Sequence, residues 1–226
     1  MPLVCLIVAL ADSHGNINTF EHLVDYVIEH EDSSSVVLHA GDIFDDGYNN
    51  GDSVAQIIRL KENFRDLIVA RGNHDPVDVF DEYFEHLPLI RDVCENVSVI
   101  AIDSNRQMLR QVDFIKNEIQ RRPDRHYVIL LHHHLVSCSD GSTSPTFWKV
   151  ALTNVLREND LIVHGHSHVS AEYRLENGTL VLCSSKANKK RYECNDNCTI
   201  CDDDSSLEYL RTRFDNDIWS HERIKI

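Results

Sequence analysis

The stretch LVCLIVALADSH, residues 3–14, places an Asp-Ser-His triplet directly after an uninterrupted apolar run. Such a run predicts a buried strand of a parallel sheet from Leu3 to Leu10. Three more polar segments follow apolar runs, namely Gly41-Asp42, Gly72-Asn73-His74-Asp75 and Gly165-His166-Ser167-His168. Because the carboxyl ends of neighbouring parallel strands meet at one edge of a sheet, we expect these side chains to lie close together.

A triple histidine, His132-His133-His134, follows another apolar run, Tyr127 to Leu131. It adds imidazole groups to the same predicted edge. Mixed oxygen and imidazole ligands that converge on one edge are typical of two borderline divalent cations sharing a carboxylate. The sequence therefore predicts a binuclear metal site.

Alternation of strands and helices fills the first two thirds of the chain, and an antiparallel, strand-rich end follows. Helices are expected at 17–31, 53–64, 79–87, 107–121 and 146–158. Strands are expected at 3–10, 36–40, 67–70, 97–102, 127–131, 161–163, 172–176, 179–183, 207–214 and 218–226. The pattern predicts an α/β fold, and neither an internal repeat nor a linker divides the sequence.

Composition and charge limit the partners. The chain has 226 residues, 42% of them hydrophobic, and a net charge of −15. This charge argues against nucleic acid or an anionic membrane as a partner. No apolar run reaches the roughly 18 residues of a membrane span, and the first apolar run lacks a positive flank and ends in Asp12. We therefore expect a cytoplasmic protein, with Cys5, Cys94 and Cys183 as reduced core thiols.

These segments resemble the calcineurin-like metallophosphoesterase superfamily, whose members carry D-x-H, G-D, G-N-H-D/E, a later H and G-H-x-H in this order. The matching motifs run from Asp12 to His168. The resemblance implies a four-layer αββα sandwich of two mixed sheets flanked by helices. It also implies one metallophosphoesterase domain over residues 1–226, with a cysteine-bearing loop insertion at about 186–206.

The resemblance implies a role for each motif residue. Seven would hold two divalent cations: Asp12, His14 and His168 the first, Asn73, His132 and His166 the second, and Asp42 both. A hydroxide bridging the cations would attack phosphorus in line with the leaving oxygen. His74 would protonate that oxygen, and Asp75 would orient His74 and raise its pKa. Spacing alone leaves His133 open as a ligand in place of His132, which fits the family pattern.

The metal identity is open among several cations. Mn²⁺ is the first choice, and Fe, Zn, Ni or Co would accept the same ligands. Three cysteines in the loop insertion, Cys194, Cys198 and Cys201, leave further alternatives. They could be ordinary or redox-active thiols, part of a structural zinc site, or ligands of an iron–sulfur cluster.

One departure from a family pattern and one further resemblance narrow the choice of substrate. The chain has Gly41-Asp42-Ile43-Phe44-Asp45-Asp46-Gly47, without the arginine of the protein Ser/Thr phosphatases. The segment from Arg125 to His134 instead resembles the cyclic-nucleotide and glycerophosphodiester phosphodiesterases of the superfamily. A phosphodiesterase acting on a small molecule or a nucleotide is therefore the first hypothesis. The alternatives are a phosphomonoesterase, a nuclease of the same superfamily, and a non-catalytic metal-binding scaffold.

Overall fold

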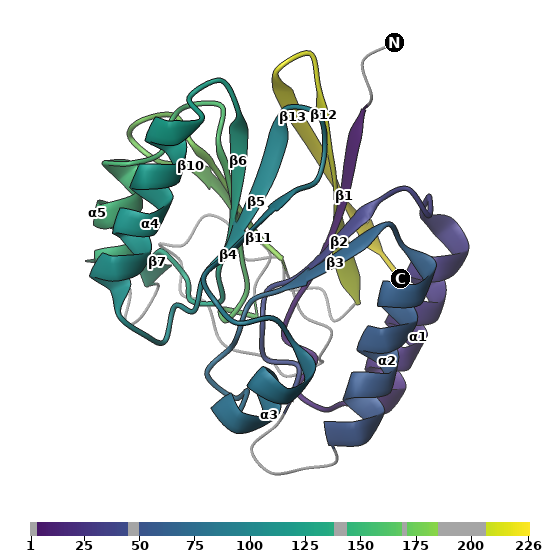
Figure 1. The fold of residues 1–226 in the computed structure, drawn as a ribbon. Coiled ribbons are helices and arrows are strands. Elements are labelled where there is room, and N and C mark those ends of the chain that lie inside the picture. Colours follow the sequence, from purple (N-terminus) through teal and green to yellow (C-terminus); the bar gives the residue numbers. More distant parts are fainter. Residues whose placement is uncertain (1–3, 45–49, 138–143, 169–170, 185–206) are drawn as a thin grey trace.

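The computed structural model describes residues 4–44, 50–137, 144–168, 171–184 and 207–226. Two mixed sheets pack face to face, with helices on both outer faces (Figure 1). This is the predicted αββα sandwich. The predicted cysteine-bearing insertion at about 186–206, and most of the loop before the last predicted helix, lie outside the described residues.

The first sheet has the strand order β13-β12-β1-β2-β3. Its parallel part is β1 (Cys5–Leu10), β2 (Val36–His39) and β3 (Asp66–Val69). β12 (Glu208–Asp215) pairs antiparallel with β1 and with β13 (Ile218–Lys225). The strand β12, near the end of the chain, thus lies beside the first strand, and β13 forms the edge of the sheet.

The second sheet has the order β10-β11-β9-β6-β5-β4. Its parallel centre is β5 (Val97–Ala101), β6 (His126–Leu130), β9 (Leu161–His164) and β11 (Leu180–Cys183). Antiparallel edge strands close it, β4 (Leu89–Asp92) and β10 (Ala171–Arg174). β7 (Val136–Ser137) and β8 (Ser144–Pro145) form a separate pair.

Side chains along a strand point alternately to the two faces of its sheet, and this alternation accounts for the layers. In β1, Ile7 and Ala9 point into the core between the sheets, whereas Val8 and Leu10 face the helices. α1 (Ile17–His30) and α2 (Asn50–Asn63) cover the first sheet, and α4 (Met108–Arg121) and α5 (Phe147–Thr153) cover the second. α3 (Val77–Tyr83) follows β3 near the carboxyl ends of the strands (Figure 1).

The sheets are also joined covalently, which corrects one prediction. Cys5 in β1 and Cys94, in the turn between β4 and β5, form a disulfide. The prediction of reduced core thiols is wrong for this pair, although Cys183 is free and buried. Disulfides persist mainly in oxidising compartments, so the bridge removes one reason for the cytoplasmic placement, which stays a prediction. Within the described ranges, no helix combines the length and apolar character needed to cross a membrane.

Candidate metal centre

The polar segments meet where the two sheets come together. Asp12 follows β1, Asp42 follows β2 and Asn73 follows β3, while His132 follows β6 and His166 follows β9. Backbone hydrogen bonds hold the segments in place, including His14 N–H to the Asp42 carbonyl at 2.9 Å. The His166 N–H donates to both oxygens of Asp12, at 3.0 and 2.9 Å, and so links the two sheets at the site.

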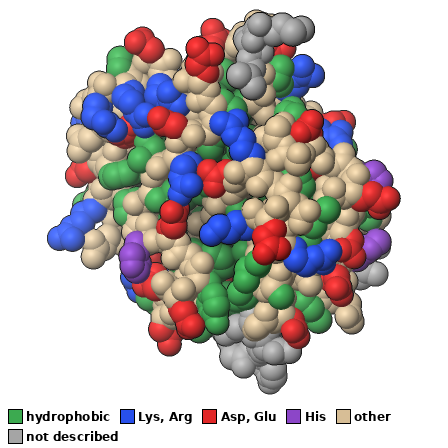
Figure 2. Space-filling model, turned by 45° about the vertical axis from the view of Figure 1, so that its right-hand side comes forward, with side chains coloured by type: hydrophobic (Ala, Val, Ile, Leu, Met, Phe, Trp, Pro, Cys, Tyr) green, Lys and Arg blue, Asp and Glu red, His purple; other side chains and the backbone are tan. Residues whose placement is uncertain are grey.

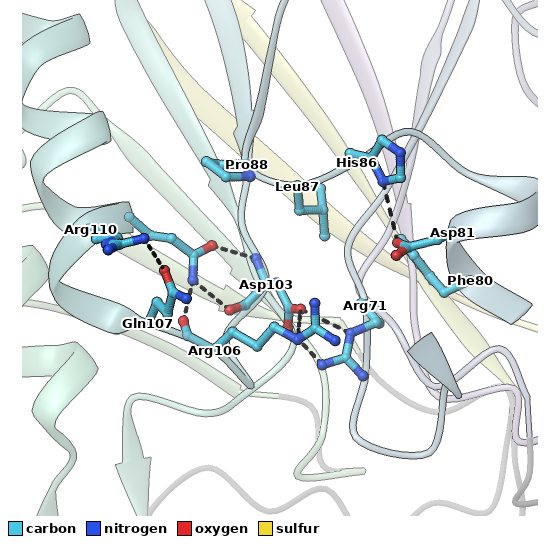
Figure 3. A pocket seen from close by; sticks show the side chains of 11 residues that line it. Arg71, Phe80, Asp81, His86, Leu87, Pro88, Asp103, Arg106, Gln107 and Arg110 are labelled. Carbon is cyan, nitrogen blue, oxygen red and sulfur yellow. Dashed lines mark hydrogen bonds and ion pairs between the residues drawn. The ribbon is translucent and has the colours of Figure 1, made fainter. Parts of the chain in front are cut away.

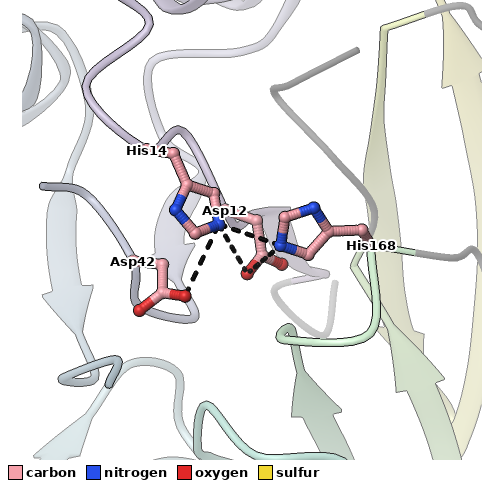
Figure 4. Close-up of side chains that lie close together, drawn as sticks. All are labelled: Asp12, His14, Asp42 and His168. Carbon is pink, nitrogen blue, oxygen red and sulfur yellow. Dashed lines mark hydrogen bonds and ion pairs between the residues drawn. The ribbon is translucent and has the colours of Figure 1, made fainter. Parts of the chain in front are cut away.

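One group of side chains contains Asp12, His14, Asp42 and His168 (Figure 4). Their ligand atoms all lie within 4.8 Å of one another. The Nε2 atoms of His14 and His168 are 2.8 Å apart, and His14 Nε2 is 3.5 Å from Asp42 Oδ2. Four donors from three loops thus surround one point.

A second group contains Asp42, His132 and His166, with Asn73 beside it. His132 Nε2 lies 3.2 Å from Asp42 Oδ2, 3.0 Å from His166 Nδ1 and 2.9 Å from Asn73 Oδ1. Asp42 therefore belongs to both groups. The structure brings together all seven residues predicted as ligands, although their assignment as ligands stays a prediction.

Geometry favours His132 over His133 within the triplet. The Nδ1 atom of His132 is 2.8 Å from the Ala40 carbonyl, which can only accept, so this nitrogen carries the proton and Nε2 is free to coordinate. His133 is turned toward Ser104, with its Nδ1 atom 2.9 Å from the hydroxyl.

Strained backbone marks the same residues. Asp12, His14, Asp42, His166 and His168 all have positive φ, between 46° and 71°. Residues with side chains seldom adopt this left-handed region, and departures of this kind concentrate at functional sites. Hydrogen bonds from their backbone N–H groups hold four of them in place, namely Asp12, His14, Asp42 and His166.

Electrostatics of the side chains fit a cation. Complete burial raises the pKa of Asp12 to about 8, and the nearby His132 offsets only part of that effect. Burial also opposes ionisation of Asp42, but the hydrogen bond and charge of His132 outweigh it and hold the pKa of Asp42 below its usual range. Two carboxylates, one amide and four imidazoles are a donor set that suits two divalent cations, which would stabilise these buried charges.

The carboxylate of Asp75 is engaged by backbone N–H groups that the sequence did not predict. Its Oδ2 atom accepts the backbone N–H groups of Asp42 and Gly72, at 2.9 and 2.8 Å, and its Oδ1 accepts that of Phe44 at 2.9 Å. These bonds tie the segment after β3 to the segment after β2. Asp75 therefore positions the backbone of Asp42, and its predicted role in orienting His74 stays a prediction.

His74 lies at the rim of the centre and is partly exposed. Its backbone N–H donates to Asp42 Oδ1 at 2.9 Å, and its ring meets the ring of His14 edge-on, with the centroids 5.0 Å apart. The backbone of His74 is thus anchored to Asp42, and its imidazole lies against His14 of the first ligand group.

The sequence interpretation missed a supporting ion pair. The Arg71 guanidinium donates to both oxygens of Asp103, at 2.9 and 3.2 Å, and to the Asp75 carbonyl at 3.0 Å. Both side chains are only 9% exposed. Arg71 directly precedes the Gly72-Asn73-His74-Asp75 segment. This position beside a recognised motif is the feature of the sequence that could have pointed to a supporting role.

Comparisons with known proteins agree with this geometry. The family described as calcineurin-like phosphoesterase matches residues 6–170. No curated protein matches the chain.

Several solved structures share the fold. The purple acid phosphatase PPD1 from yellow lupin (Lupinus luteus) seeds is 17% identical, with a TM-score of 0.72, covering 100% of this chain and 52% of its own. A dimetal phosphatase from Danio rerio, LOC 393393, is 12% identical, with a TM-score of 0.65 and coverages of 100% and 99%. Yfce, a phosphoesterase from E. coli, is 14% identical, with a TM-score of 0.50 and coverages of 95% and 91%.

Proposed function

Because the chain belongs to the calcineurin-like phosphoesterase family, we propose that its metal centre hydrolyses small phosphodiesters, nucleotides among them. The observation that carries this proposal is the position of Asp42 in both ligand groups. A shared carboxylate holds two cations close enough to act on one phosphoryl group. The chain is a metal-dependent phosphoesterase, and the diester class and the metal identity are the proposed parts.

The residues of the chain have distinct tasks in this reaction. Two bound cations would supply Lewis acidity and lower the pKa of water. Asp42 and the six other predicted ligands would position them, with the imidazoles leaving the centre a net positive charge for the phosphoryl oxygens. His74, at the solvent-facing rim, would face the ester and donate a proton to the leaving oxygen. Asp75 would keep Asp42 in place through the backbone.

Two observations support a small diester as substrate. The segment from Arg125 to His134 resembles the small-molecule phosphodiesterases of the superfamily. Acidic and basic side chains are interspersed over the face in Figure 2, and the net charge is −15, which disfavours a long polyanion. We propose Mn²⁺ as the cation because the carboxylate and amide oxygens suit it, although the four imidazoles would also accept Fe, Zn, Ni or Co.

A hydrolysis assay tests the proposal. Metal-stripped protein would be supplied with Mn²⁺, Fe²⁺, Zn²⁺, Ni²⁺ or Co²⁺ and assayed on bis(p-nitrophenyl) phosphate and on p-nitrophenyl phosphate. We expect Mn²⁺ to restore diester turnover most strongly. Turnover of the monoester alone would overturn the diester assignment, and turnover of neither ester with two metals bound would overturn hydrolysis of such esters.

A variant pair tests the role of His74. His74→Ala should keep two metals and slow diesters with poor leaving groups more than p-nitrophenyl esters, because only a poor leaving group needs the proton. His22→Ala, an exposed histidine on α1, is the matched control and should behave like the wild type. An equal slowing of all esters in His74→Ala would contradict the acid role.

A further inference from the structure

A cavity of about 270 Å³ lies between α3 and α4 (Figure 3). Its walls are Arg71 after β3, the chain from α3 to β4, and the segment from Asp103 into the first turn of α4. Among the described residues, the cavity lining and the two metal-ligand groups have no member in common. The cavity is therefore distinct from the metal-ligand groups, although Arg71 in its wall directly precedes the segment that carries Asn73.

Arginine dominates the charge of this cavity. Arg71, Arg106 and Arg110 line it together with the carboxylates Asp81 and Asp103. On a chain with a net charge of −15, three guanidinium groups against two carboxylates still leave a local excess of one positive charge. Guanidinium groups match the planar and tetrahedral oxygens of carboxylate and phosphate.

One of the three arginines, Arg71, already binds other residues of the chain. Arg71 forms the buried two-pronged pair with Asp103, and its third contact is the Asp75 carbonyl. The Asp103 oxygens also face the Asn105 backbone N–H at 3.0 Å. Asp103 is thus engaged by partners of its own and forms part of a fixed wall.

The other two arginines have capacity for a ligand. Arg106 approaches Asp103 only to 3.7 Å and its side chain is 52% exposed. Arg110 donates to Gln107 Oε1 at 3.1 Å, which uses one of its five N–H groups. Both stand at the start of α4, a helix of 14 residues with no acidic residue in its first turn. The positive end of the helix dipole adds to their attraction for an anion.

Apolar side chains cover the opposite wall. Leu87 and Pro88 lie across the cavity from Arg71 and Arg106 (Figure 3), and Phe80 also lines it. A hollow with guanidinium groups on one side and apolar carbon on the other fits a molecule with a charged head and an organic body.

We propose that this cavity binds a small organic phosphate, with its phosphoryl oxygens on Arg106 and Arg110 and its organic part against Leu87 and Pro88. The inference does not depend on the hydrolytic function. Inorganic phosphate shares the head-group chemistry but lacks the body, so it should bind at least about tenfold more weakly.

Calorimetry with phenylphosphonate, whose C–P bond resists hydrolysis, tests the proposal on the metal-loaded full chain. The key variant is Arg106→Gln/Arg110→Gln. The matched control is Lys116→Gln/Arg121→Gln, which removes two cations from the same helix away from the cavity. We expect the wild type and the control to bind one equivalent more than the key variant, whatever the metal centre itself binds.

Each other outcome overturns a stated part. If all three proteins bound the same number of equivalents, the proposed site would not exist. The same conclusion would follow if the control lost as much binding as the key variant. Equal affinity for inorganic phosphate would remove the organic part of the ligand. Gln107→Glu serves if the double variant does not fold, because a carboxylate beside Arg110 competes with the anion and should weaken the extra equivalent at least about tenfold.

Discussion

Replacing Asp75 by Asn tests whether this residue positions the metal ligands. The carboxylate accepts three backbone N–H groups, those of Asp42 and Gly72 on one oxygen and that of Phe44 on the other. An asparagine offers a single acceptor oxygen. In either orientation its NH₂ group would face a backbone N–H, so at least one bond between the two segments is lost.

Two opposing effects set the change in stability. Asp75→Asn would lose a charge-assisted hydrogen bond, and the new NH₂ group would face a backbone N–H, so that two donors meet. Together these changes cost about 1–3 kcal/mol of unfolding free energy. In the other direction, burial raises the pKa of Asp75 to about 6 from 3.8, so the ionised form carries a penalty of about 3 kcal/mol above pH 6 that is absent below pH 3.8. Asparagine removes this penalty, and we expect the unfolding free energy of metal-free protein at pH 7.5 to change by less than about 2 kcal/mol.

Metal binding should respond more strongly than stability. The segment after β2 would lose one of the two bonds that fix its backbone, the one from the Asp42 N–H or the one from the Phe44 N–H, and small displacements of catalytic groups can cost about a hundredfold in rate. We expect at least a tenfold loss of metal affinity, the size seen when supporting residues of metal ligands are changed. Metal titration, urea unfolding and diester turnover would be measured beside Asp113→Asn, an exposed acid on α4 that should match the wild type.

One result would refute this reasoning. Asp75→Asn could bind both metals with unchanged affinity and turn over p-nitrophenyl esters normally, yet slow esters with poor leaving groups. Asp75 would then act on His74, as the family resemblance implies. Loss of stability alone, with metal affinity and turnover intact, would also contradict the positioning role.

Three more predictions concern other parts of the molecule. Asp42→Asn should release both metals and lower turnover at least about a thousandfold, because the two ligand groups share this residue and act as a unit. His39 is fully buried with neither ring nitrogen hydrogen-bonded within the described chain, and burial lowers its pKa to about 3. Between pH 7.5 and 5 the unfolded histidine takes up a proton and the buried one does not, so the wild type loses about 2 kcal/mol of unfolding free energy through His39. In His39→Leu this part of the loss should be absent. Cys5→Ala/Cys94→Ala opens a bridge that spans 89 residues and should lower the unfolding free energy by about 4 kcal/mol.

Each of these has a direct check. Metal analysis of Asp42→Asn would contradict the shared role if one cation stayed at full affinity. Urea unfolding at pH 5 and 7.5 would contradict the histidine argument if the pH dependence of His39→Leu matched that of the wild type. Reductant should destabilise the wild type and leave Cys5→Ala/Cys94→Ala unchanged; no effect on the wild type would mean that the bridge does not form.

The sequence was sufficient for the layers and for the convergence at the site. Ile7 to Leu10 form part of an apolar run because both faces of β1 are covered, one by the other sheet and one by helices. Because the apolar run marks where β1 ends, it also places Asp12 at a strand end, beside Asp42 at the end of the neighbouring strand. Helix ends were less predictable. The helix expected at 146–158 ends at Thr153, and Asn154 and Val155 form a turn in its place.

Contacts across the sandwich could not be predicted in this way. The bridge between Cys5 and Cys94 requires knowing that the start of β1 lies against the turn after β4, and neither residue carries a motif. Asp75 sits inside a recognised motif, yet its partners are backbone N–H groups, which no sequence pattern reports. The Arg71–Asp103 pair joins residues 32 apart through the packing of two sheets.

The metal centre and the stability of the fold are coupled through the same few residues. Five of the seven predicted ligands have left-handed backbone, which costs of order 1 kcal/mol or more for each residue, although Asp and His tolerate it better than most. Asp12 is also fully buried and favours its protonated form, with a pKa of about 8. The strain of the left-handed backbone and the cost of ionising Asp12 are both present in the metal-free chain. A bound cation would stabilise the left-handed geometry and the ionised carboxylate together. Binding energy at this edge is therefore also folding energy, and the strand ends that build the site are stabilised by the cations that they position.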